Sequence, residues 1–183
     1  MVNVQPDFEK FIELKGITVK SNGRTILNIP HAIIPADRIT ACIGPNGAGK
    51  TTFLKILDGL IKPDTGTVSY SFANKTALVL HHTPMIKASA RTNMSMVTDS
   101  DPSISSIAID AVMEQIGLSH LANSPAHKLS AGEKQKLCLG RVILQKPNLI
   151  LLDEPTANLD PNTTEQVEEI IRQLALFNKT AGM

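Results

Sequence analysis

The chain has 183 residues, a net charge of +1 and 42% hydrophobic residues, enough for one compact unit or a small two-lobed one. The dispersed basic residues argue against nucleic acid as a partner. No run of eighteen apolar residues and no N-terminal signal pattern occurs, so we expect the chain neither to span a membrane nor to be exported. Cys42 and Cys138 lie in apolar stretches and are expected to be buried thiols in a reducing compartment.

Strand-like stretches open the chain. β-branched residues predict strands at 17–20 and at 25–34, the second interrupted by Pro30. The apolar run at 38–43 predicts a further strand directly before a glycine-rich segment.

Residues 44–52 read GPNGAGKTT, the spacing of a phosphate-binding loop between a strand and a helix. We expect glycines 44, 47 and 49 to provide left-handed backbone and close approach, so that amides wrap a triphosphate at a helix N-terminus. Lys50 is expected to contact the β and γ oxygens, and the Thr51 hydroxyl to bind Mg²⁺. The alternative is a glycine-rich turn with a solvated lysine. Phe53, Ile56, Leu57 and Leu60 are expected to bury one side of the following helix.

Beyond a turn at 62–66, strands are predicted at 67–71 and 76–80. Helices and loops follow from about residue 83 to 147, with one apolar stripe on Ile104, Ile107, Ala111 and 114–116 and another helix at 133–146. A continuous apolar run at 148–152 predicts a strand covered on both faces, and a last helix is predicted at 162–177.

Asp153 and Glu154 end the apolar run at 148–152. Ligands bind beyond the carboxyl ends of parallel strands, so both acids are expected at the same edge as the phosphate loop. Asp153 suits Mg²⁺, and Glu154 suits orienting or deprotonating an attacking water. The alternative is a solvated turn, or acidic residues before the next helix.

Ser130 and Glu133 in the sequence LSAGE match a capping box that starts a helix. A capping box does not explain Gly132, and a helix N-terminus with a hydroxyl and a glycine is also a second phosphate site. The local sequence leaves both interpretations open.

The order GPNGAGKTT, LSAGEKQKLCLGRVILQKP and NLILLDEPTANLD resembles the ATP-binding cassette ATPases of ABC transporters, over nearly the whole chain. The resemblance implies an α/β fold with a P-loop NTPase (RecA-like) core, an antiparallel β subdomain and a helical subdomain insertion. It implies one domain over 1–183, incomplete at the C-terminus, with 1–82 and 148–183 as the nucleotide-binding core and 83–147 as the helical subdomain.

The resemblance also implies the site and its partners. The ATP-binding residues would be Gly44, Pro45, Asn46, Gly47, Ala48, Gly49, Lys50, Thr51 and Thr52, with Ser130 and Gly132 serving the ATP of the partner subunit in a head-to-tail homodimer. Mg²⁺ would be held by Thr51, Asp153 and a residue at position 82. Residues 157–160 would cross the same interface. Transmembrane permease subunits and a solute-binding protein are expected partners, with the chain cytoplasmic and peripheral on the inner face of the membrane.

Four departures from the family pattern stand out. Residues 19–23 contain no aromatic side chain to stack on adenine, a contact worth on the order of 1–3 kcal/mol, so weaker or less base-selective ATP binding is expected. His82 replaces the Mg²⁺-contacting glutamine, although two partly exposed histidines at a strand end are an equal interpretation. Ala131 replaces a glycine. None of the five histidines (His31, His81, His82, His120 and His127) follows Glu154, where the family has a further strand and a switch histidine. We therefore expect a piece of a longer chain, or alternatively impaired hydrolysis.

The leading functional prediction is an ATPase subunit of a bacterial-type importer. The alternatives are a nucleotide-binding regulator without turnover and a soluble cassette protein of DNA repair or translation. The segment 83–93 is similar to that of tungstate and molybdate importers, and also to that of other importers.

Overall fold

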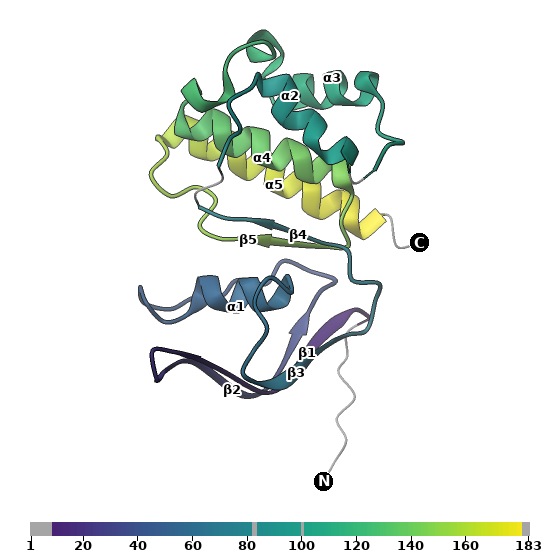
Figure 1. Cartoon of the computed structure of the whole chain (residues 1–183). Helices are drawn as coiled ribbons and strands as arrows, with labels where there is room; N and C mark the ends of the chain where they lie inside the picture. The colour runs from purple at the N-terminus through teal and green to yellow at the C-terminus, as the bar shows by residue number, and fades with distance from the viewer. Residues whose placement is uncertain (1–8, 82–83, 100, 181–183) are drawn as a thin grey trace. The chain divides into compact units, whose positions relative to one another are not determined.

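The computed structural model describes residues 9–81, 84–99 and 101–180, and the chain forms two compact units that divide between Leu78 and Val79 (Figure 1). Each unit is described here by itself. Residues 79–183 form the second unit. The predicted grouping of 148–183 with residues 1–82 in a nucleotide-binding core stays a prediction.

The first unit contains a three-stranded antiparallel sheet in the order β2-β1-β3. Its strands are β1 (Phe11–Ser21), β2 (Arg24–Pro35) and β3 (Thr65–Tyr70). Asn22 and Gly23, both with positive φ (49° and 76°), make the two-residue hairpin turn that joins β1 to β2. Pro30 is tolerated inside β2 because β2 lies at an edge of the sheet.

One face of β1 supplies the core of this sheet. Ile12 and Leu14 are buried, and the alternation resumes at Ile17 and Val19 instead of at even positions. Gly16, with φ of 60°, lies at the shift, near which the pairing with β3 moves out of register between Lys15 and Thr18. The extra residue therefore keeps all four apolar side chains on one face.

The strand predicted at 38–43 is not formed. Residues 39–45 have no regular secondary structure, Ile39 and Ile43 are 71% and 93% exposed, and Cys42 is exposed, contrary to expectation. A strand is stable when neighbouring strands satisfy its amides, and no described strand pairs with this segment. Apolar composition alone was therefore an insufficient signal here.

Helix α1 (Lys50–Leu57) follows the glycine-rich loop, as predicted. Ile56 and Leu57 are buried, but Leu60 is 63% exposed because the helix ends before it. The Tyr70 hydroxyl donates to the Leu57 carbonyl at 2.6 Å and so satisfies an acceptor of the last turn.

In the second unit, β5 (Leu149–Leu152) pairs with β4 (Thr76–Val79), the strand in which the division between the units falls. Its α-helices are α2 (Ala90–Ser95), α3 (Ser106–Gln115), α4 (Ala131–Gln145) and α5 (Pro161–Thr180). Short 3₁₀ turns connect them at η1 (Met96–Asp99), η2 (Ser119–Leu121) and η3 (Ala126–Lys128). In Figure 1, α4 and α5 lie side by side beneath α2 and α3. The core of this unit includes the fully buried Met94, Met113, Leu118, Leu137, Leu139 and Val167.

The buried face of α3 differs from the predicted one. Ile107 and Ala111 are exposed, whereas Ile109, Val112 and Met113 are buried. The helix begins at Ser106, after the N-cap Ser105, so the stripe that includes Ile104 and Ile107 does not face the core.

Candidate functional site

The glycine-rich loop folds as a tight turn in front of α1. The Ala48 amide donates to the Pro45 carbonyl at 3.2 Å, and Gly47 and Gly49 have φ of 81° and 90°. Gly49 also packs against β2, and a Cβ at this position would lie 3.1 Å from the Ile26 carbonyl oxygen. Gly44, however, is not left-handed, and a Cβ there would meet only Ala48 at 3.5 Å. The prediction of left-handed backbone is thus confirmed for two of the three glycines.

Lys50 is the first residue of α1, and its side chain folds back over the loop. Its Nζ donates to the carbonyl of Gly44 at 2.8 Å and to that of Pro45 at 3.2 Å. These contacts place the ammonium group over the turn, where the first amides of a helix and the positive end of its dipole also lie. An anion at this turn therefore meets a full positive charge and backbone donors together.

Thr51 is exposed and Thr52 is half-buried in the first turn of α1. The predicted metal ligand His82 lies outside the described residues. Within the described part of the chain, no group of three or more His, Cys, Asp and Glu side chains could hold a metal by itself.

Asp153 and Glu154 follow β5, as predicted, and differ sharply in environment. The Asp153 amide donates to the Val79 carbonyl at 2.9 Å, and Asp153 is buried, with 7% of the residue exposed. Glu154 is exposed and has a φ of 49°, a conformation that costs a non-glycine residue of order 1–3 kcal/mol. Strained backbone of this kind clusters at functional sites, which agrees with the predicted catalytic role.

The loop between Glu154 and α5 makes several hydrogen bonds, within itself and to His81. The Ala157 amide donates to the Glu154 carbonyl at 3.1 Å, and Asn158, with φ of 61°, has its Nδ2 3.4 Å from His81 Nε2. Asp160 accepts from the Thr163 amide at 3.0 Å, the pattern of a helix N-cap, and Pro161 occupies the first helical position.

Ser130 and Glu133 form the predicted capping box of α4. The Glu133 amide donates to Ser130 Oγ at 3.3 Å, and the Ser130 amide donates to Glu133 Oε2 at 2.7 Å. The bond from the Ser130 amide holds the pKa of Glu133 below its ordinary value. Gly132 is buried against Thr163 of α5, a packing role that the sequence did not indicate.

A buried polar cluster was also missed. Asn93 is fully buried; its Nδ2 donates to the Ser89 and Ile86 carbonyls at 3.0 and 3.2 Å, and its Oδ1 accepts from the Ile86 amide at 3.1 Å. Arg141 of α4 donates from Nε to the Asn93 carbonyl at 2.9 Å and from Nη2 to Asn93 Oδ1 at 3.0 Å. Burial lowers the pKa of Arg141 from its ordinary value. This cluster ties the start of α2 to α4.

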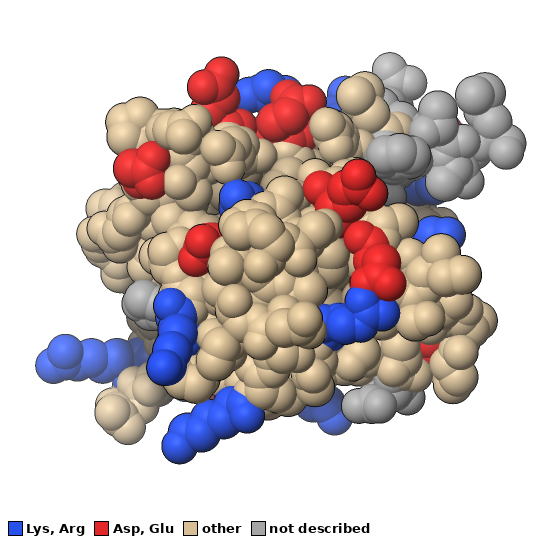
Figure 2. Space-filling view, turned by 90° about the horizontal axis from the view of Figure 1, so that it is seen from above, with Lys and Arg blue, Asp and Glu red and all other residues tan. Residues whose placement is uncertain are grey.

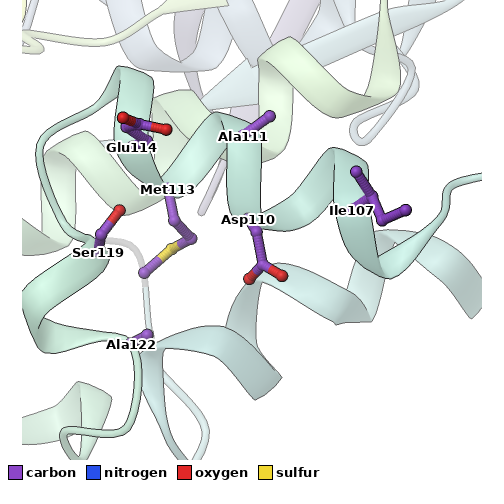
Figure 3. Close-up of a pocket in the computed structure, with 7 residues that line it drawn as sticks. All are labelled: Ile107, Asp110, Ala111, Met113, Glu114, Ser119 and Ala122. Carbon is purple, nitrogen blue, oxygen red and sulfur yellow. The ribbon is translucent and has the colours of Figure 1, made fainter.

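A shallow groove of about 450 Å³ lies along α3 and η2 (Figure 3). Met113 lies in the middle of the group, with Asp110 and Glu114 carboxylates beside it and Ile107 at one end (Figure 3). None of the predicted site residues lines this groove. On the face in Figure 2, acidic and basic side chains are interspersed with uncharged ones.

The predicted site residues are therefore distributed over both units. The phosphate loop with Lys50 lies in the first unit, and Ser130, Gly132, Asp153 and Glu154 lie in the second. The proximity of Lys50 to Glu154 stays a prediction. No described helix has the length and apolar character that crossing a membrane requires.

Three comparisons place this arrangement among known proteins. A family model described as ABC transporter matches residues 27–157. The zinc import ATP-binding protein ZnuC of Saccharophagus degradans is 34% identical over 170 residues, which cover 89% of this chain and 64% of that protein. The tungstate uptake system ATP-binding protein TupC of Peptoclostridium acidaminophilum is 32% identical over 87% of this chain and 79% of its own length.

The fold agrees with a solved structure. cbiO1 from Clostridium perfringens, part of the ABC transporter complex cbiONQ, superposes with a TM-score of 0.74 at 22% identity, covering 92% of this chain and 74% of that one. The α/β fold of the P-loop NTPases is thereby confirmed. Since the family model covers more than half of the sequence, the chain belongs to the ABC transporter family.

Proposed function

We propose that this chain is the ATP-binding and ATP-hydrolysing subunit of an ABC transporter whose membrane subunits are separate chains. The observation that carries the proposal is the loop at residues 44–52, where Lys50 Nζ closes over the Gly44 and Pro45 carbonyls at the N-terminus of α1. A cationic turn of this kind suits a triphosphate. The proposed ATP-binding residues are Gly44, Pro45, Asn46, Gly47, Ala48, Gly49, Lys50, Thr51 and Thr52.

Mg²⁺ is the proposed cofactor. The Thr51 hydroxyl and the Asp153 carboxylate supply oxygen donors, the kind that Mg²⁺ prefers, and too few to hold it without phosphate and water. When bound, Mg²⁺ would neutralise charge on the β and γ phosphate oxygens. A contribution from His82 stays a prediction.

The proposed reaction is in-line hydrolysis. Glu154 orients a water and accepts its proton while a bond forms from the water oxygen to the γ-phosphorus. The bond from the γ-phosphorus to the bridging oxygen breaks, and ADP and inorganic phosphate result. Lys50 stabilises charge that develops on the transferring group.

The proposed assembly is a head-to-tail homodimer in which Ser130 and Gly132 approach the nucleotide bound by the partner. Permease subunits and a solute-binding protein complete it, with this chain on the cytoplasmic face of the membrane. The proposed cargo is a small ion, and we propose an oxyanion such as tungstate or molybdate. Of the relatives named above, one is a zinc import protein and the other belongs to a tungstate uptake system.

The test is phosphate release by the purified chain with Mg²⁺ and ATP. Lys50→Ala should weaken nucleotide binding at least tenfold, because a hydrogen bond to a charged group contributes about 1.5–3 kcal/mol. Lys55→Ala, in the last turn of the same helix, is the matched control. Glu154→Gln should bind ATP and fail to hydrolyse it. Binding without phosphate release in the unmodified chain would instead favour the regulatory alternative, which His82 in place of a glutamine supports.

A further inference from the structure

The first turns of α4 and α5 are in unusually close contact. A Cβ added to Gly132 would overlap the methyl group of Thr163 and lie 3.3 Å from its Cβ. Real Cβ atoms do not approach a side chain so closely, so either the residue at 132 stays a glycine or Thr163 must move.

Thr163 is not free to move out of the way. Its hydroxyl donates to Asp160 Oδ2 at 2.6 Å, and its amide donates to Asp160 Oδ1 at 3.0 Å. β-Branched side chains have few χ1 rotamers in a helix, and rotation away from Gly132 would break the hydroxyl bond. The methyl group is therefore held against Gly132 by the N-cap of its own helix.

The two helices run in the same direction. Gly132 meets Thr163, and one turn later Lys136 Nζ donates to Gln166 Oε1 at 3.0 Å. Both N-termini consequently lie at the same end of the pair, so the loops that lead into them, ending at Ser130 and at Asp160, are neighbours within one subunit.

We propose that Thr163 is a positioning residue that couples the segment 130–132 to the loop 157–160 within one chain. The coupling rests on the proposed function, in which both segments face the partner subunit. Gly132 then has two roles, since it admits the Thr163 methyl as well as the partner's phosphate, and a shift of either segment is passed to the other through the Gly132, Thr163 and Asp160 contacts.

Two substitutions test the methyl group and the hydroxyl group of Thr163 separately. Thr163→Ser removes the methyl group and keeps the hydroxyl, whereas Thr163→Val keeps a methyl at that place and removes the bond to Asp160. In ATP hydrolysis we expect each substitution to lower kcat at least fivefold with KM changed less than twofold, because each breaks one of the two contacts that couple the segments. Thr164→Val, one residue along, is the matched control. A kcat within twofold of that of the unmodified chain in either Thr163 variant would overturn the coupling.

A second measurement does not depend on hydrolysis. Gly132→Ala should speed amide hydrogen exchange in residues 157–160 severalfold. Adding Thr163→Ser, which makes room for the new methyl and keeps the hydroxyl bond to Asp160, should restore the slower exchange. Unchanged exchange in Gly132→Ala would refute the proposal even if the chain hydrolyses ATP. If the unmodified chain releases no phosphate, the proposed function fails, while the exchange measurement still decides the coupling.

Discussion

Gly44 and Gly49 belong to one loop, but only Gly49 has a backbone conformation and a close neighbour that require glycine. Gly49 has φ of 90° and faces the Ile26 carbonyl, so Gly49→Ala should destabilise the fold by about 1–3 kcal/mol. Gly44 has neither constraint, and Gly44→Ala should change the free energy of unfolding by less than about 0.5 kcal/mol. Urea unfolding of both variants measures the difference. Equal losses would show that the loop adopts another conformation.

Glu133 makes the capping box of α4 dependent on pH. Because its folded-state pKa lies below the ordinary 4.5, its bond to the Ser130 amide stabilises the fold above that pH and loses this effect as the pH falls through the lower folded value. The thermal midpoint of the unmodified chain should therefore fall more steeply than that of Glu133→Gln between about pH 5 and pH 3. Parallel curves for the two chains would contradict this expectation.

At the scale of elements, α2 depends on Asn93. Asn93→Ala would leave the Ile86 amide and the Arg141 guanidinium without their side-chain acceptor, so we expect a loss of about 2–3 kcal/mol in stability. Asn123→Ala, at an exposed position, should stay within about 0.5 kcal/mol of the unmodified chain. Chemical denaturation followed by circular dichroism compares the two.

The segment 38–43 gives a second element-scale prediction. Cys42 is exposed and Cys138 is buried, so a thiol reagent should modify one of the chain's two cysteines rapidly in the native state and both in denaturant. Cys42→Ser should abolish the rapid phase. Slow modification of both thiols would mean that the segment is covered, as a strand inside a sheet would be.

For the whole molecule, nucleotide binding should appear as added stability. A ligand that binds only the native state at one hundred times its dissociation constant stabilises it by about 2.7 kcal/mol. We therefore expect Mg²⁺ and a non-hydrolysable ATP analogue to raise the thermal midpoint of the unmodified chain and of Glu154→Gln. The midpoint of Lys50→Ala should rise less at the same concentration, because a tenfold weaker affinity leaves only about 1.4 kcal/mol of stabilisation.

Motifs with a local mechanism were predictable from the sequence. The capping box at Ser130, the helix after Gly49 and the strand before Asp153 are each encoded within a few neighbouring residues. Features that depend on distant partners were not: the contact of Gly132 with Thr163 and the bond from Arg141 to Asn93 join residues far apart in the sequence. The strand predicted at 38–43 was wrong for the same reason, and Ile39 and Ile43 are exposed. A strand needs neighbouring strands, which its own sequence does not specify.

The left-handed backbone at Glu154 is strained for a residue that carries a side chain, so stability and the proposed activity favour different residues at this position. Glycine or asparagine would relax that conformation, so a search for heat-resistant variants would favour them at this position. In the proposed function the Glu154 carboxylate orients the attacking water, so selection for turnover would retain it. Thermal stability and the proposed activity thus favour different residues at position 154. In a related protein that no longer hydrolyses ATP, we expect glutamate to be replaced at this position early.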